Sequence, residues 1–190
     1  MKYDRFINNT ILTGLVRPQY TNECSINAVT GALNAITDGQ LRREDIYEIT
    51  GWDSEPVTNG DIGNVEVLRA LRKCCKHLNI SATVSLFINS ISRYEKLWTK
   101  FKEAVRYENT ALIYHADNHY CLIAGYFEEP WNRKCLDTEG YQNRRDWIIL
   151  ADHSSDRNPI RTITWSDARD ELNEYSGYGI LRIQKLNSKR

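Results

Sequence analysis

The sequence lacks an excess of either charge, and it lacks any long hydrophobic run. Its 190 residues include 25 Lys and Arg against 25 Asp and Glu, so the formal net charge is zero. A chain with balanced charge has no net positive charge to attract nucleic acid or an anionic membrane surface. No apolar run approaches the length that crosses a bilayer, and no charged-then-apolar leader opens the chain. We therefore expect no nucleic-acid or membrane partner, and a protein that is cytoplasmic or is delivered from the cytoplasm as an effector.

The cysteines offer neither a disulfide framework nor a closed metal site. Their odd number, five, argues against paired disulfides and favours a reducing environment. Adjacent Cys74 and Cys75, followed by His77, could suggest zinc ligands, but neighbouring side chains on a helix point about 100° apart. His115 and His119 would need a turn to converge, and the cysteine-rich spacing typical of zinc sites is absent. We expect no metal and no cofactor.

The patterning favours one α+β domain. Hydrophobic residues make up 41% and charged residues 26%, a globular composition, and there are no repeats or low-complexity linkers. Helical patterns dominate about 10–106, apart from a predicted strand at 82–87, and strands dominate about 107–185. This order predicts a single domain over 1–190, in which a helical part packs on an antiparallel sheet with a cleft between them.

Cys24 lies at the first turn of a predicted helix. It ends the stretch Pro18-Gln19-Tyr20-Thr21-Asn22-Glu23-Cys24. A buried helical face follows it, with apolar residues at the 3/4 spacing: Ile26, Val29, Leu33 and Ile36. Unpaired N–H groups and the helix dipole favour negative charge there, which favours a nucleophilic thiolate. Gln19 could direct its amide to the space above the sulfur. The alternative is a buried structural cysteine.

A cysteine nucleophile needs a base and a group that orients the base. His119 opens a predicted strand over 119–126, and Asp152 ends another over 147–152. If these strands pair as an antiparallel hairpin, both residues reach the same edge of the sheet. The alternatives are a capping or surface histidine and a turn aspartate. Cys121, on the same strand face as His119, is expected to pack in the core.

Together these motifs resemble the papain-like cysteine peptidase superfamily, and within it the bacterial C39-like branch. Cys24 followed by Leu33-Asn34-Ala35 is also similar to phytochelatin synthase. The resemblance covers about 17–36, 110–126, 147–153 and 160–183. Relatives usually have a small residue beside the cysteine, where this chain has Glu23 and Ser25.

The resemblance implies a papain-like fold with a defined set of site residues. Cys24 would be the nucleophile, His119 the base and Asp152 its orienting group. Gln19 would donate to the oxyanion together with the Cys24 N–H.

The resemblance also implies a thiol hydrolase that cleaves an amide, peptide or isopeptide bond through an acyl-enzyme. Its substrate would be a peptide or protein, or a small amide or thiol compound. Capture of the acyl group by an amine or thiol would instead make it an acyltransferase, a transpeptidase or a transglutaminase-like enzyme. A third interpretation is a binding module that kept the fold and lost turnover.

Overall fold

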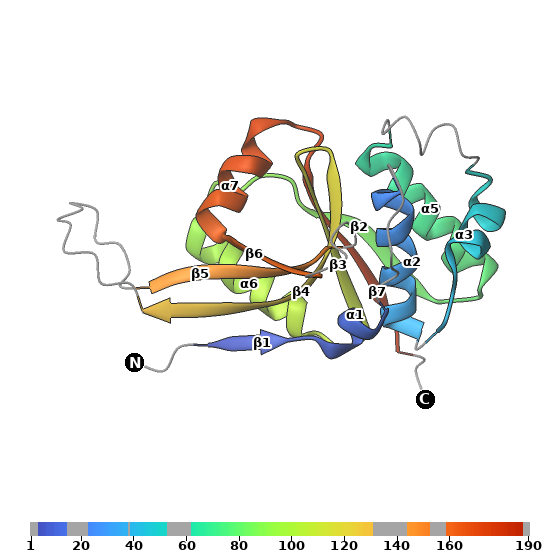
Figure 1. The fold of residues 1–190 in the computed structure, drawn as a ribbon, viewed down its shortest axis with the longest axis horizontal. Coiled ribbons are helices and arrows are strands. Elements are labelled where there is room, and N and C mark those ends of the chain that lie inside the picture. Colours follow the sequence, from blue (N-terminus) through green and yellow to red (C-terminus); the bar gives the residue numbers. More distant parts are fainter. Residues whose placement is uncertain are drawn as a thin grey trace.

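The part of the chain that the structure describes is built on one antiparallel sheet, which has seven strands; Figure 1 shows the arrangement. The computed structural model describes residues 4–14, 23–37, 39–52, 62–130, 144–152 and 159–187. The strands are β1 (Arg5–Ile7), β2 (Ala82–Ile88), β3 (Thr110–Ala116), β4 (His119–Pro130), β5 (Arg144–Ala151), β6 (Ile160–Thr164) and β7 (Gly179–Lys185). Their order across the sheet is β2-β7-β3-β4-β5-β6, and β1 pairs with β4 off this path. Every pairing is antiparallel.

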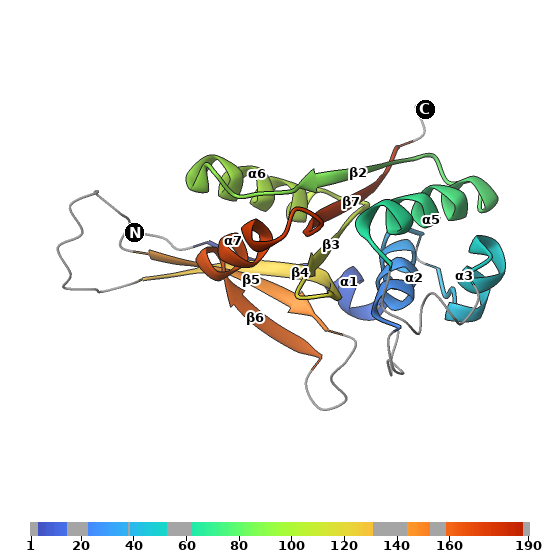
Figure 2. The ribbon, with the colours of Figure 1, turned by 90° about the horizontal axis from the view of Figure 1, so that it is seen from above.

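Helices gather in two groups around this sheet. They are α1 (Asn9–Gly14), α2 (Cys24–Thr37), α3 (Arg43–Thr50), α5 (Asn64–His77), α6 (Tyr94–Arg106) and α7 (Trp165–Glu174). Both Figure 1 and Figure 2 show α2, α3 and α5 clustered together, apart from α6 and α7. Two apolar cores result, one with α2 and α5 and the other with α6 and α7. Along β3, Leu112 and Ile113 enter different cores, because successive strand residues point to opposite faces.

Helix α2 is buried on all sides. Every residue from Ser25 to Ile36 is buried, which is a wider contact than the single face that the sequence predicts. Small residues allow the neighbouring elements to approach closely; they are Ala28, Ala32 and Ala35. The helix therefore fixes the position of Cys24, its first residue, against the sheet.

Strands β3, β4 and β5 set the edge of the sheet at which His119 lies. A two-residue turn, Asp117-Asn118, joins β3 to β4, and both residues have positive φ (50° and 53°). Such turns match the twist of a hairpin, and Asp and Asn adopt this conformation more readily than most residues. Strand β5 then pairs with β4 in a register that places Ala151 opposite Leu122.

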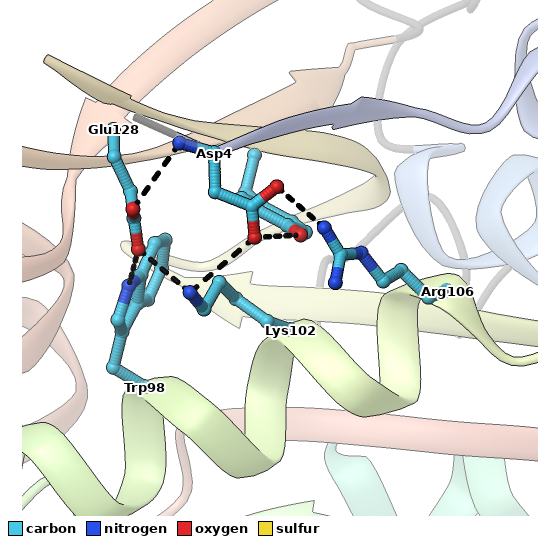
Figure 3. A network of polar contacts seen from close by, with 6 residues as sticks. Asp4, Trp98, Lys102, Arg106 and Glu128 are labelled. Carbon is cyan, nitrogen blue, oxygen red and sulfur yellow. Dashed lines mark hydrogen bonds and ion pairs between the residues drawn. The ribbon is translucent and has the colours of Figure 1, made fainter. Parts of the chain in front are cut away.

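A polar network holds the N-terminal segment to the sheet and to α6 (Figure 3). Glu128 Oε1 accepts hydrogen bonds from Trp98 Nε1 (3.1 Å) and Lys102 Nζ (2.7 Å). Asp4 forms ion pairs with Lys102 and Arg106, and its N–H donates to Glu128 Oε2. Because these partners come from the chain start, α6 and β4, the network joins three elements that lie far apart in sequence.

The predicted α+β class and antiparallel sheet are confirmed. The strand predicted at 82–87 is present as β2, and it pairs with β7 at one end of the sheet. Within the described residues, no helix is both long and apolar enough to span a membrane.

Candidate functional site

His119 and Asp152 form a hydrogen-bonded pair at the edge of the sheet. His119 Nε2 donates to Asp152 Oδ1 at 2.9 Å. The backbone of Asp152 is held in turn, because its N–H donates to the Pro159 carbonyl at 2.7 Å. Arg161, from β6, places its Nε 3.7 Å from the other carboxylate oxygen. The aspartate therefore contacts both an imidazole and a guanidinium.

Cys24 reaches the same site from the start of α2. It is partly exposed, and its side chain interacts with the ring of His119. The preceding residue, Glu23, lies at the N-cap position of the helix, since its carbonyl accepts from Asn27 N–H at 3.0 Å. Its carboxylate forms an ion pair with Arg43 and accepts a hydrogen bond from Tyr47 Oη, both on α3. Sequence reasoning noted Glu23 only as an unusual neighbour of the cysteine, and missed that it ties α2 to α3.

The surroundings of His119 favour its protonated form. Burial lowers the pKa of His119, but hydrogen bonds with Asp152, Cys121 and Cys24 raise it by more than burial lowers it. The net shift of the pKa is therefore upward. A protonated ring between two sulfur atoms and a carboxylate attracts negative charge to those sulfurs. The arrangement can thus polarise Cys24 through the ring of His119.

Cys121 is buried, as predicted, but it also contributes to this site. Its sulfur, a ring nitrogen of His119 and an oxygen of Asp152 all lie within 4.8 Å of one another. Sulfur, nitrogen and carboxylate donors suit a transition metal such as zinc. Against this, the Arg161 guanidinium lies 3.9 Å from the Cys121 sulfur, where its positive charge opposes a second cation. The expectation of no metal and no cofactor stays a prediction.

A cavity of about 470 Å³ opens beside Cys24, between α2, α5 and the sheet. Its polar wall is rigid, because His115 Nδ1 lies 2.9 Å from Asn64 Oδ1 and the His115 ring stacks on Tyr120 at 3.9 Å. Tyr120 Oη donates to the Ile62 carbonyl at 3.0 Å. Burial lowers the pKa of His115 to about 4; the charge of His119 adds to this shift, and a hydrogen bond with the Gly177 backbone opposes it. His115 is therefore neutral near pH 7.

The rim of the same cavity is apolar and exposed. It includes Val65 from α5, Leu86 from β2 and Tyr175 from the segment before β7. Their exposed fractions are 62%, 43% and 58%. The sequence does not reveal this rim or the Asn64–His115 pair, because their members are distant in sequence and no local motif connects them.

The structure thus brings together Cys24, His119 and Asp152 of the predicted site. Gln19 and Cys135 lie outside the described residues, as does most of the insert between β4 and β5. The cavity lies where a cleft between the helical part and the sheet was expected.

Comparison with known proteins decides the family. A family model described as basic immunoglobulin-like variable motif-containing protein matches residues 1–189. The chain belongs to this family. A family member from Giardia intestinalis is 25% identical over 86% of this chain and 73% of its own length. The human and Xenopus laevis members are 22% identical over 83% of this chain, and the match spans only 35% of their length.

This family membership contradicts the predicted papain-like identity. Neither the family description nor the names of these relatives mention a peptidase or any other enzyme. The assignments to the C39-like branch and to phytochelatin synthase-like proteins are therefore wrong. The predictions of a hydrolase or cysteine protease, and of an acyltransferase or transglutaminase-like enzyme, are wrong with them. The error has a physical origin: a cysteine at a helix start facing a histidine and an aspartate at a sheet edge is a local geometry, and similar geometries recur on unrelated folds.

Proposed function

We propose that this chain is a binding module that holds an extended peptide segment of a partner protein in the cavity beside Cys24. The observation that carries the proposal is the concentration of exposed apolar side chains on this one rim. Of the seven large hydrophobic side chains exposed among the described residues, Val65, Leu86 and Tyr175 line this cavity. Clustered exposed apolar residues around a concave site are typical of ligand-binding surfaces. We also propose that residues 1–190 form a single domain that carries this site.

The position of the cavity favours an extended ligand. Within the described residues β2 pairs only with β7, so β2 has a free edge, and Leu86 of β2 lines the cavity. Free strand edges pair with extended peptides through main-chain hydrogen bonds, while pockets beside them select side chains. The ligand would lie along β2 and place an apolar side chain between Val65 and Tyr175.

One charged residue in the cavity favours a basic group on the ligand. Glu66 lines the cavity, is half-buried, and has no ion pair within the described part of the chain. His115, which also lines the cavity, is neutral near pH 7 and does not neutralise it. We expect the bound segment to carry a Lys or Arg next to its apolar residue.

The site residues proposed from the sequence then have a binding role. His119, protonated and oriented by Asp152, would hold the Cys24 side chain in place through their hydrogen bond without touching the ligand itself. Cys24 would contact the ligand through its partly exposed sulfur. Gln19, just before α2 in the chain, would supply a further amide donor.

A peptide-display selection tests the proposal. Selected peptides are synthesised, and their Kd is measured by fluorescence polarisation for the unmodified protein and for two variants. Leu86→Glu alters the rim, and Leu186→Glu alters an equally exposed leucine outside this cavity (43% and 45% exposed). We expect Leu86→Glu to weaken binding about tenfold or more, because it removes the burial of a leucine side chain, and Leu186→Glu to leave Kd within about twofold.

The selected sequences are themselves informative. Enrichment of an apolar residue next to Lys or Arg supports the proposal, and Glu66→Gln should then weaken binding of those peptides. Equal weakening by Leu86→Glu and Leu186→Glu, or a failure to select any peptide that binds saturably, would overturn it.

A further inference from the structure

We propose a second binding site in this protein, for a phosphate monoester, between α6 and the β2–β7–β3 part of the sheet. A cavity of about 330 Å³ lies there. Phe87 lines it, whereas Leu86, the preceding residue of β2, lines the peptide cavity. Phe87 packs against the core that includes α6, whereas Leu86 faces the cavity beside α2 and α5, so the two sites lie on opposite faces of β2. This site is independent of the proposed peptide site and stands if that proposal fails.

Two cations converge on one aromatic ring in this cavity. Lys100 Nζ of α6 lies 4.7 Å from the centroid of the Phe87 ring, and Arg182 Cζ of β7 lies 5.1 Å from it. Neither cation forms an ion pair with a carboxylate among the described residues. Two like charges held around one ring repel each other, and an anion bound between them would relieve that repulsion.

Hydrogen-bond donors in the same cavity also lack partners. Arg182 Nε and Thr110 Oγ1 are buried, and neither has a hydrogen-bond partner within the described part of the chain. Buried polar atoms are usually paired, and a phosphate bound in this cavity would supply the acceptor that both of these donors lack. Gln184 also lines the cavity and adds an amide. A guanidinium, an ammonium, a hydroxyl and an amide thus surround one volume.

This donor set suits a phosphate better than a carboxylate. A guanidinium fork binds two phosphate oxygens at once, and an ammonium acts as a point charge on a third. Two positive charges also match the charge of about −1.5 to −2 that a phosphate monoester carries near pH 7. The Phe87 ring offers an apolar surface to the organic part of the ester.

Glu103 limits what the site accepts. It lines the cavity from the exposed face of α6 and adds one negative charge to it. Glu103 lies three residues from Lys100 on the same helix, so its charge weakens the binding of every anion and weakens a more highly charged polyphosphate most. The ester could be a phosphorylated side chain of a protein or a small metabolite, which share this chemistry.

NMR titration of the full chain tests the site, with the Arg182 Nε–H signal as the readout. The probes are inorganic phosphate, glycerol 3-phosphate, and the peptide acetyl-Ala-phosphoserine-Ala-amide with its unphosphorylated form as control. We expect saturable shifts of the Arg182 signal with phosphorylated probes and none with the unphosphorylated peptide. Tighter binding of the phosphopeptide assigns a modified protein as the source, and tighter binding of glycerol 3-phosphate assigns a small ester.

Variants of exposed residues on α6 make the test specific without threatening the fold. Lys100→Met should raise Kd about tenfold, because it removes one charged hydrogen-bond donor. Glu103→Gln should lower Kd, and Lys96→Met, an exposed lysine of α6 that does not line the cavity, should leave it unchanged. The proposal is overturned if no phosphorylated probe shifts the Arg182 signal saturably, or if Lys100→Met and Lys96→Met have equal effects.

Discussion

His119 Nε2 lies 2.9 Å from Asp152 Oδ1, although the two residues are 33 positions apart in the chain. The pairing of β4 with β5 produces this contact, because β4 begins at His119 and β5 ends one residue before Asp152. The same edge receives Cys24 from α2. Cys24, His119 and Asp152 thus form one polar cluster beside the cavity with the apolar rim.

This cluster predicts that Cys24 is the most reactive described thiol. The other described cysteines are buried, and burial raises the pKa of Cys74 to about 12 and also raises that of Cys75. Iodoacetamide should therefore label Cys24 first in a Cys135→Ser background. His119→Gln should slow this labelling about tenfold, because it removes the positive charge beside the sulfur.

The labelling experiment is read by peptide mapping in a mass spectrometer. His77→Gln is the matched control, because His77 is exposed on α5 and lies outside the cavity. Its labelling rate should equal that of the unmodified protein. If His119→Gln labels as fast as His77→Gln, the histidine does not act on Cys24.

The lowered pKa of His115 predicts that the protein loses stability in acid. The folded chain holds its pKa at about 4, whereas the ordinary value is 6.5. Below pH 6.5 the unfolded chain binds a proton that the folded chain does not bind until about pH 4, so the free energy of unfolding falls through this window. The shift corresponds to about 3 kcal/mol.

Urea denaturation between pH 4 and 7 measures this effect. As the pH falls over that range, the free energy of unfolding of the His115→Gln variant should decrease by about 3 kcal/mol less than that of the unmodified protein. His119, whose raised pKa acts in the opposite direction, is common to both proteins, so its contribution cancels apart from its coulombic interaction with His115. Parallel stability curves for the two proteins would show that His115 is not held neutral by the fold.

Loss of the Glu23–Arg43 ion pair should lower the free energy of unfolding more than loss of a surface ion pair does. Only 15% of the Arg43 side chain and 18% of the Glu23 side chain is exposed. Arg43→Met leaves a largely buried carboxylate without its main partner, which should lower the free energy of unfolding by about 2 kcal/mol. Arg69→Met, at an exposed position of α5, should change it by less than about 0.5 kcal/mol. Equal effects in urea denaturation would mean that the pair adds no more than a surface charge does.

Gly125 allows β1 to lie in close contact with β4. A Cβ atom at this position would overlap the carbonyl oxygen of Phe6 in β1. Gly125→Ala should therefore displace β1 and cost about 2 kcal/mol. The N–H of Asn8, which donates to the Ala124 carbonyl at 2.7 Å, should also exchange faster with deuterium. Gly63→Ala is the control, since its added Cβ would approach only the flexible end of Glu66; a similar cost there would rule out the Phe6 overlap as the cause.

The sequence predicts those parts of the fold that depend on local patterns. The helix that begins at Cys24 follows from its apolar spacing, and the edge shared by His119 and Asp152 follows from two strand patterns with one hairpin. Strand β1 was not predicted, because three residues show no period and gain their stability from pairing with β4.

Contacts between distant residues could not be predicted. Glu23 meets Arg43, and Asn64 meets His115, only because helices pack on the sheet in a particular way. Family membership was also beyond the local motifs, because a cysteine, a histidine and an aspartate in the right order do not specify one fold. The cytoplasmic location and the role of Gln19 stay predictions.

Cross-linking of a selected peptide tests most directly whether the cavity beside Cys24 is a binding site without turnover. A peptide from the display selection is synthesised with a chloroacetyl group at successive positions and incubated with the Cys135→Ser protein. We expect the peptide to label Cys24 much faster than chloroacetamide alone does, at one or two peptide positions, and the attached peptide to keep its full mass. Labelling no faster than by chloroacetamide, or recovery of a cut peptide, would contradict it.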